Sequence, residues 1–133
     1  AGTGNVMAAA GLGAAAEFLA AHGREIRARE RTLARRLHEG LLEMPGVSVL
    51  GPGPDEKRVP VVSVVHARLA PDKIAFALDR RHGIAVRAGL HCSPWTHETI
   101  GTLESGALRF SVGWSTSEDD IDAALAAMRE LCA

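Results

Sequence analysis

The sequence contains no tyrosine and has only two tryptophans and three phenylalanines among its 133 residues. A core built from this chain must therefore consist mainly of leucine, valine, isoleucine and alanine. Hydrophobic residues make up 47% of the chain, which is typical of an ordinary globular protein. Because a chain of this length fits one domain, we expect residues 1–133 to form a single one.

The net charge is close to zero, and cysteine is also rare. The formal net charge is -1, so the total charge does not favour binding to nucleic acid or to an anionic membrane surface. Only two cysteines are present, Cys92 and Cys132, and two do not make a disulfide framework; we therefore expect a reducing, cytoplasmic location. No run of 18 uncharged apolar residues occurs, so no transmembrane helix is expected.

Several common motifs are missing as well. The sequence has no GxGxxG, no P-loop and no GxSxG, which argues against the dinucleotide-binding, nucleotide-hydrolysing and serine-hydrolase classes that use them. His91, Cys92 and His97 could be considered as metal ligands, but their spacing matches no standard zinc arrangement and a fourth ligand is not evident. We therefore expect no metal site.

Hydrophobic periodicity and breaker residues predict alternating helices and strands. Asn5 or Thr3 is expected to cap a first helix, and His22–Gly23 to end or kink it. A Ser-x-x-Asp capping box at Ser117–Asp120 begins the last helix. The predicted helices are 6–22, 24–44, 71–82 and 118–131, the predicted strands are 47–50, 59–66, 84–87 and 108–112, and residues 93–105 are predicted to be irregular with one helical turn. This order predicts an α+β fold of two layers, with a small, largely antiparallel sheet of four strands covered by helices.

An arginine row follows one face of the predicted helix 24–44. It consists of Arg24, Arg27, Arg31 and Arg35, with Glu25, Glu30 and Glu39 nearby. A solvated face partly paired with these glutamates is the favoured interpretation. Binding of an acidic partner is the alternative.

The stretch Arg87–Cys92 places a thiol beyond a glycine, with an imidazole next to it and a guanidinium nearby. A thiolate is the nucleophilic form of cysteine, and neighbouring positive charge favours it over the thiol. Cys92 is therefore a candidate nucleophile. On position alone, a small buried and unreactive cysteine is the more common alternative.

Arg109 lies inside an apolar predicted strand, where burial of a guanidinium is costly without an anionic partner. Its planar fork suits a substrate carboxylate. A structural ion pair with Glu104 or with an acid of the last helix is an equally good interpretation. At the other end of the chain, Thr3 and Asn5 stand at a helix start, where backbone amides can bind phosphate, although ordinary capping is far more common.

Four blocks of sequence make the chain resemble the C-terminal part of class V aminotransferase-fold enzymes, and among them the cysteine desulfurase and selenocysteine lyase family. Ala1–Asn5 resembles the AGTPN segment of that family, with Gly4 in place of the proline, and Gly11–Ala15 resembles its GLGAA. Val86–Pro94 resembles the VRxGxHCAP block around the catalytic cysteine. Arg109–Ser111 followed by Ser115–Asp122 resembles its RxSxxxYNTxEEID ending.

The resemblance implies a role for each matching residue. Cys92 would attack the sulfur or selenium of L-cysteine or L-selenocysteine and carry it as a persulfide, and Arg109 would hold the substrate α-carboxylate. His91 and Arg87 would line the substrate pocket. Thr3, with Asn5 beside it, would reach the cofactor phosphate of the partner subunit in a homodimer.

The cofactor that the resemblance implies is pyridoxal phosphate, which acts as an electron sink. A persulfide-acceptor protein is a further implied partner. The Schiff-base lysine of such enzymes belongs to a large domain upstream, whereas the only lysines here, Lys57 and Lys73, match no family motif. We therefore expect residues 1–133 to be the C-terminal domain of a longer enzyme, unable to use the cofactor alone.

Trp114–Ser115 also departs from the family pattern, since many relatives have Tyr-Asn there. Two alternatives stay open. One is a class V aminotransferase, lyase or epimerase without persulfide chemistry. The other is a non-catalytic dimerisation or partner-binding module that uses the Ala/Gly face of residues 8–16 or the arginine row.

Overall fold

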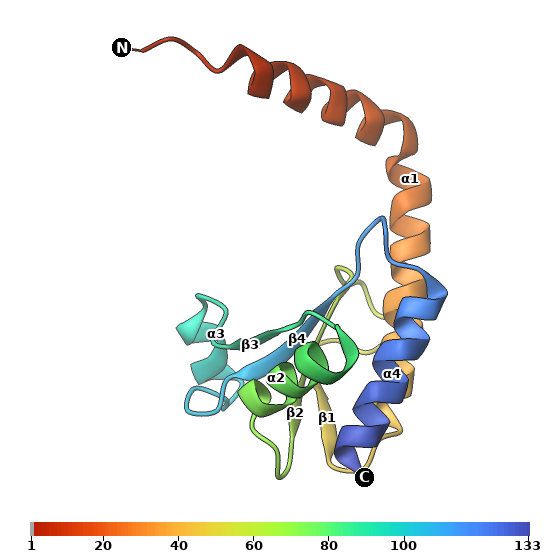
Figure 1. The fold of residues 1–133 in the computed structure, drawn as a ribbon, viewed down its shortest axis with the longest axis vertical. Coiled ribbons are helices and arrows are strands. Elements are labelled where there is room, and N and C mark those ends of the chain that lie inside the picture. Colours follow the sequence, from red (N-terminus) through yellow and green to blue (C-terminus); the bar gives the residue numbers. More distant parts are fainter. Residues whose placement is uncertain (1) are drawn as a thin grey trace.

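The computed structural model describes residues 2–133, which form four helices and four strands. Figure 1 shows how these elements are arranged. The elements are α1 (Val6–Leu42), β1 (Val47–Leu50), β2 (Val61–His66), α2 (Pro71–His82), β3 (Arg87–Gly89), α3 (Pro94–Thr99), β4 (Ala107–Ser111) and α4 (Glu118–Cys132). The strands form one sheet in the order β1-β2-β4-β3, and every neighbouring pair is antiparallel. The predicted α+β class with a four-stranded antiparallel sheet is confirmed.

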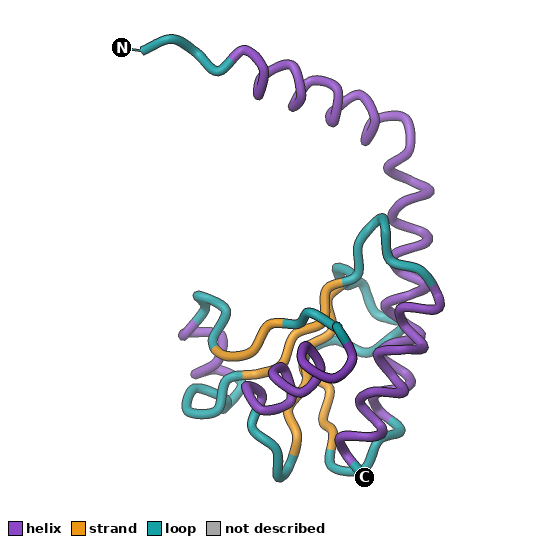
Figure 2. Tube along the Cα trace, viewed as in Figure 1, coloured by secondary structure: helices purple, strands orange, loops and turns teal. Residues whose placement is uncertain are grey.

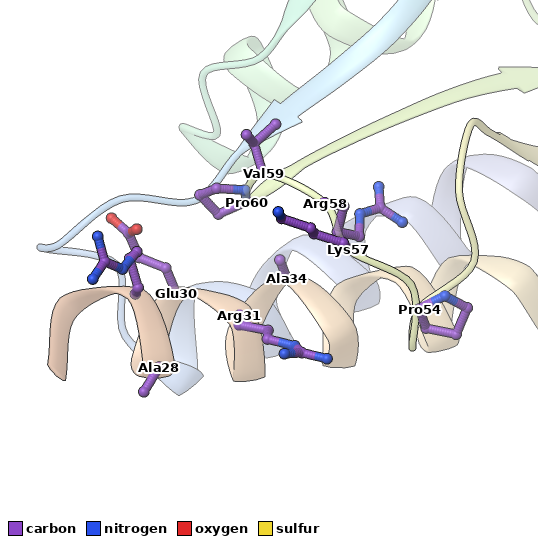
Figure 3. Close-up of a pocket in the computed structure, with 10 residues that line it drawn as sticks. Ala28, Glu30, Arg31, Ala34, Pro54, Lys57, Arg58, Val59 and Pro60 are labelled. Atoms are coloured by element: carbon purple, nitrogen blue, oxygen red, sulfur yellow. The ribbon is translucent and has the colours of Figure 1, made fainter. Parts of the chain in front are cut away.

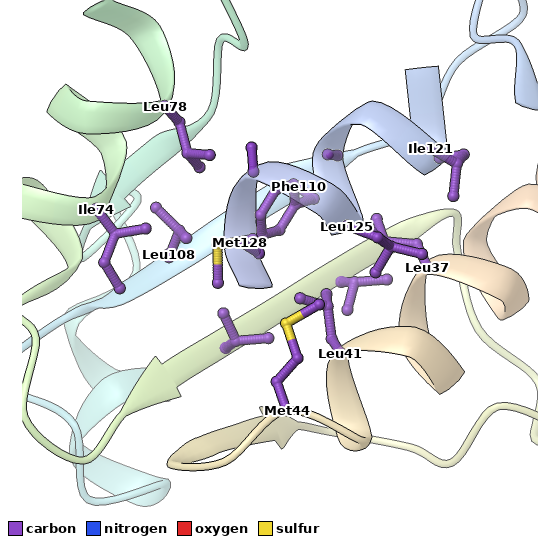
Figure 4. Close-up of a cluster of buried hydrophobic side chains, with 14 of the residues drawn as sticks. Leu37, Leu41, Met44, Ile74, Leu78, Leu108, Phe110, Ile121, Leu125 and Met128 are labelled. Atoms are coloured by element: carbon purple, nitrogen blue, oxygen red, sulfur yellow. The ribbon is translucent and has the colours of Figure 1, made fainter. Parts of the chain in front are cut away.

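One face of this sheet carries the core. Alternate residues of a strand point to opposite faces, and Val62 and Val64 of β2 lie beside Phe110 and Leu108 of β4 in the pairing register. All four are buried, and α1, α2 and α4 pack against them (Figures 2 and 4). The helical side of the core is aliphatic apart from methionine, as the shortage of aromatic residues predicts. It comprises Leu33, Leu37, Leu41, Ile74, Leu78, Ile121, Leu125 and Met128, with Met44 just after α1.

The helix α1 is continuous through Gly23, so the prediction that a first helix stops at His22–Gly23 and a second begins at residue 24 is wrong, whereas the alternative of a kink is compatible with one continuous helix. Glycine disfavours a helix by only about 1 kcal/mol and does not by itself end one. Figure 1 shows α1 changing direction partway along its length. Asn5 caps it as expected, because its side-chain oxygen accepts a hydrogen bond from the Ala8 amide at 3.0 Å.

The two parts of α1 differ in burial. Its second part supplies the core residues from Ile26 onward, whereas residues 6–22 are exposed throughout, and no described atom lies within 4 Å of a Cβ built at Gly11 or Gly13. By length and composition alone α1 is apolar enough to cross a membrane, a weak indication that core helices and signal sequences share. The Ala/Gly face of residues 8–16 therefore has no partner among residues 2–133.

One smaller element differs from the prediction. The third strand is Arg87–Gly89 rather than 84–87, because the Ile84 amide donates to the Leu78 carbonyl and completes the end of α2. Residues 94–99 form the short helix α3, which is the helical turn predicted within the irregular segment 93–105. The capping box of α4 is present, with Ser117 and Asp120 bonded reciprocally.

Leu41 and Leu42 offer a direct test of the core. Leu41 is fully buried, whereas its neighbour Leu42 is 51% exposed. We expect Leu41→Ala to lower the free energy of unfolding by about 2–5 kcal/mol, because it leaves a cavity in a packed interior. Leu42→Ala should change it by about 0.5 kcal/mol or less. Urea denaturation followed by circular dichroism measures both, and equal effects would contradict this arrangement of the core.

Candidate functional site

The second face of the sheet carries the polar residues of the candidate site. In the pairing register Arg109 of β4 lies between Arg87 of β3 and Ser63 of β2. Arg109 is half-buried and Arg87 is exposed. Two guanidinium groups thus occupy directly opposite positions on neighbouring strands. Like charges at such positions repel each other and destabilise the strand pair.

No carboxylate compensates this pair of cations. Within residues 2–133 Arg109 forms no ion pair, and its Nε is buried without a hydrogen-bond partner. The alternative of a structural pair with Glu104 or an acid of the last helix is therefore wrong. Arg87 and Arg109 border a hollow of about 200 Å³, which is completed by Ala85, Val86 and Ser111. A small anion such as a carboxylate would balance the charge there.

Cys92 lies in the turn that follows β3. The backbone of this turn is unusual, because His91 and Cys92 both have left-handed conformations, with φ of 53° and 60°. Each such residue costs about 1–2 kcal/mol, and strain of this kind concentrates at functional positions. Cys92 is exposed, so the alternative of a buried cysteine is wrong for Cys92, whereas Cys132 is buried.

His91 anchors the turn to the sheet. Its Nε2 donates to the carbonyl oxygen of Ala107 at 3.1 Å, which leaves Nδ1 buried and without a partner. Burial lowers the pKa of His91, and the positive charges of Arg109 and Arg87 lower it further. His91 is therefore neutral near pH 7, with Nδ1 free to accept a proton. The cationic neighbours of this site are the two arginines rather than the imidazole.

His97 lies next to His91 and supports the turn. It is buried, its Nδ1 is 2.7 Å from the Thr102 hydroxyl, and its ring centre lies 5.7 Å from that of His91. These contacts give His97 a structural part in holding α3 and the Cys92 turn. Among residues 2–133 no group of three or more His, Cys, Asp and Glu side chains is placed to hold a metal ion.

Thr3 and Asn5 are not brought to Cys92. Both are exposed at the free end of α1, which Figure 1 shows well separated from β3 and α3. Asn5 uses its side chain for capping. The two lysines are also elsewhere, with Lys57 in the loop before β2 and Lys73 on α2. The residues of this chain therefore do not fit a complete pyridoxal phosphate site.

Sequence reasoning did not identify Ser63 and Ser111 as part of this surface. Their signal was the alternation of polar and apolar residues in β2 and β4, which becomes informative only when the strand register is known. Trp114 lies outside the hollow. Its ring packs edge-on against Phe18 at 6.0 Å and beneath the Arg29 guanidinium at 5.8 Å, so it ties the loop before α4 to α1.

The family of this chain follows from its similarity to known proteins. Residues 1–124 match the aminotransferase class-V family. This chain belongs to that family. The resemblance to class V enzymes inferred from the four sequence blocks is thereby confirmed.

Relatives with solved structures agree in fold. The apo structure of a cysteine desulfurase from Thermococcus onnurineus is 34% identical, with a TM-score of 0.90 over 99% of this chain. The cysteine desulfurase CsdA from Escherichia coli, in an S-sulfonic acid form, is 28% identical with a TM-score of 0.85 over the whole chain. This chain covers 32% and 33% of those proteins, respectively.

The relatives found by sequence similarity are also cysteine desulfurases or probable cysteine desulfurases. A cysteine desulfurase of Synechococcus elongatus is 36% identical over 98% of this chain, and a probable cysteine desulfurase of Pseudomonas aeruginosa is 40% identical over 92%. The chain spans 20% and 29% of the length of these relatives.

Gly106 tests how the turn is positioned. It has a φ of 66°, and a Cβ there would lie 2.7 Å from the Cα and carbonyl carbon of Gly89, three residues before Cys92. We expect Gly106→Ala to lower the free energy of unfolding by about 1–3 kcal/mol. Gly113→Ala is the matched control, because no atom lies within 4 Å of its Cβ position. Urea denaturation distinguishes the two, and a control as damaging as Gly106→Ala would contradict the close contact.

Histidine burial predicts a pH dependence. Burial lowers the pKa of both His91 and His38, so the unfolded chain takes up protons first as the pH falls below about 6.5. Stability should therefore fall between pH 7.5 and pH 5. His91→Gln should reduce this fall, whereas His22→Gln, on the exposed part of α1, should not. Urea denaturation across this range provides the measurement; an unchanged slope in His91→Gln would contradict the assignment.

Proposed function

We propose that residues 1–133 form the C-terminal domain of a pyridoxal-phosphate-dependent cysteine desulfurase that removes sulfur from L-cysteine, or selenium from L-selenocysteine. The observation that carries the proposal is an exposed cysteine in a strained turn, next in sequence to His91, whose pKa is lowered by the charges of two arginines that lack a carboxylate partner. Membership of the class-V family and the similarity to several cysteine desulfurases support it.

Each residue of the candidate site would have a separate role in this reaction. Arg109, the half-buried cation of the hollow, would hold the substrate carboxylate, and Arg87 would add a second positive charge. The Cys92 thiolate would then attack the substrate sulfur. An S–S bond forms while the C–S bond of the substrate breaks, and the carbon skeleton takes a proton and leaves as alanine. Cys92 keeps the transferred sulfur as a persulfide.

His91 would assist without carrying charge. With Nε2 committed to the Ala107 carbonyl, Nδ1 is the one ring nitrogen that can accept a proton from a neighbouring group. Its lowered pKa keeps this nitrogen unprotonated near pH 7. His91 would thereby be available to receive the thiol proton of Cys92 or of the substrate.

The cofactor would be held mainly outside this chain. Pyridoxal phosphate supplies an electron sink for the carbon skeleton when it is bound. Neither Lys57 nor Lys73 lies at the Cys92 turn. We infer that the anchoring lysine belongs to the rest of the protein, and that Thr3 and Asn5 at the free end of α1 face the cofactor phosphate of a second subunit in a homodimer. A cytoplasmic location and a separate persulfide-acceptor protein complete the proposal.

Cys92→Ala tests the nucleophile in the full-length protein. We expect loss of alanine formation from cysteine while the cofactor absorbance is retained, because only the sulfur acceptor is removed. Cys132→Ala, which changes the buried cysteine, should leave turnover close to that of the parent. A Cys92→Ala enzyme with unchanged turnover would contradict the proposal. A protein that transaminates instead would favour a class V aminotransferase without persulfide chemistry.

Arg109→Gln tests whether Arg109 binds the carboxylate of the substrate. Loss of a charged hydrogen bond to the substrate should lower kcat/KM by about 10- to 100-fold, chiefly through a higher KM. Arg80→Gln, on the exposed surface of α2, is the matched control and should have no effect. Steady-state kinetics with L-cysteine distinguishes them. An unchanged KM in Arg109→Gln would show that another group holds the carboxylate.

A further inference from the structure

A second hollow of the described chain is remote from Cys92. It measures about 410 Å³ and lies between the second part of α1 and the loop of residues 54–60 (Figure 3). The loop is fixed at the Val112 end of β4, because the Pro60 carbonyl accepts from the Val112 amide. The Cys92 turn is fixed at the opposite end, at Ala107. A ligand in this hollow would therefore leave the cysteine accessible.

The hollow is lined by apolar residues and by basic residues, which we call its rim. The apolar residues are Ala28 and Ala34 of α1 and Pro54, Val59 and Pro60 of the loop, and Val59 is 69% exposed although it is β-branched and apolar. An exposed apolar surface of this kind next to a concave site is typical of a place where another molecule binds.

Four cations and one carboxylate border the apolar surface: Arg27, Arg31, Lys57, Arg58 and Glu30. Arg27, Arg31 and Lys57 form no ion pair with any residue in 2–133. Figure 3 shows the loop passing over the part of the helix that bears Glu30, Arg31 and Ala34. The rim thus has an excess of positive charge that the described chain does not balance.

Arg58 is a fixed part of this rim. Its guanidinium donates to the carbonyl oxygens of Pro52 and Val61, at 2.8 and 2.6 Å, and contacts His38. No carboxylate is among these partners, and burial lowers the pKa of Arg58. The loop is therefore held by a cation whose charge is uncompensated.

The structure also separates the two interpretations of the arginine row. Arg35 pairs with Glu39 at 2.7 Å and with Asp55 at 2.9 Å, as the paired solvated face predicts. Arg31 and Arg27, one and two turns earlier on α1, have no such partners and border the hollow instead. The part of the row next to the apolar surface is therefore without a carboxylate partner among residues 2–133, as is Arg24, which does not line the hollow.

We propose that this hollow docks an acidic segment of a partner protein, with carboxylates on the basic rim and an apolar side chain on the surface of Val59 and Pro60. A protein segment fits better than nucleic acid, because the lining is mainly apolar, includes Glu30 and contains no aromatic side chain for base stacking. The proposal does not depend on the chemistry of Cys92, so it can fail or succeed independently of the proposed function.

The test uses the chain and a fluorescein-labelled peptide of alternating glutamate and leucine, with binding measured by fluorescence anisotropy. We expect saturable binding that weakens with added salt, and no binding of the counterpart peptide that has lysine in place of glutamate. Arg27→Glu with Arg31→Glu should raise Kd at least about tenfold. Arg80→Glu with Arg81→Glu on α2 changes the net charge equally and should leave Kd unchanged.

A second pair of variants tests the apolar contact. Val59→Ser should weaken binding, whereas Phe76→Ser, at a similarly exposed position on α2, should not. Absence of saturable binding, or equal loss in the two charge-reversal variants, would overturn the proposal. Displacement of the peptide by a single-stranded oligonucleotide that binds more tightly would overturn it in favour of nucleic acid.

Discussion

The two faces of β4 determine the rest of this structure. Leu108 and Phe110 point into the core against β2 and three helices, and this forces Arg109 between them onto the opposite face. A shift of one residue in the strand register would bury the guanidinium and expose both apolar side chains. The packing energy of the core therefore holds an unpaired cation at a fixed place on the open face, and Arg87 joins it through the pairing of β3 with β4.

The Cys92 turn depends on the same strand. The left-handed conformations of His91 and Cys92 are unfavourable, and the bond from His91 to the Ala107 carbonyl helps to hold them. Below the turn, the buried His97 and its bond to Thr102 fix the start of the segment that leads back to β4. The proposed nucleophile Cys92, the imidazole of His91 and the proposed carboxylate-binding Arg109 are thus held by β3, β4 and the turn that follows β3, at one edge of the sheet.

Much of the fold could be predicted from the sequence, because periodicity and capping are local signals. The helix 71–82, the strand 47–50 and the capping box at Ser117 agree with the structure. The break expected at Gly23 is absent, since a glycine disfavours a helix without ending it, and β3 begins later than expected because Ile84 completes the end of α2. The candidate site around Cys92 was predicted from its resemblance to a family motif rather than from the physical properties of the residues. Neither the strain at Cys92 nor the lack of a partner for Arg109 can be read from residue order, because both depend on the strand register and on contacts between distant residues.

In the proposed function, Cys92 rather than any other group receives the transferred sulfur. To test this, the full-length protein is exposed to L-cysteine without reductant, its thiols are blocked, and the peptide that contains Cys92 is measured by mass spectrometry after digestion. We expect this peptide to gain the mass of one sulfur atom, the gain to disappear on reduction, and the Cys132 peptide to be unchanged. A Cys92 peptide without added sulfur, in a protein that still forms alanine from cysteine, would contradict it.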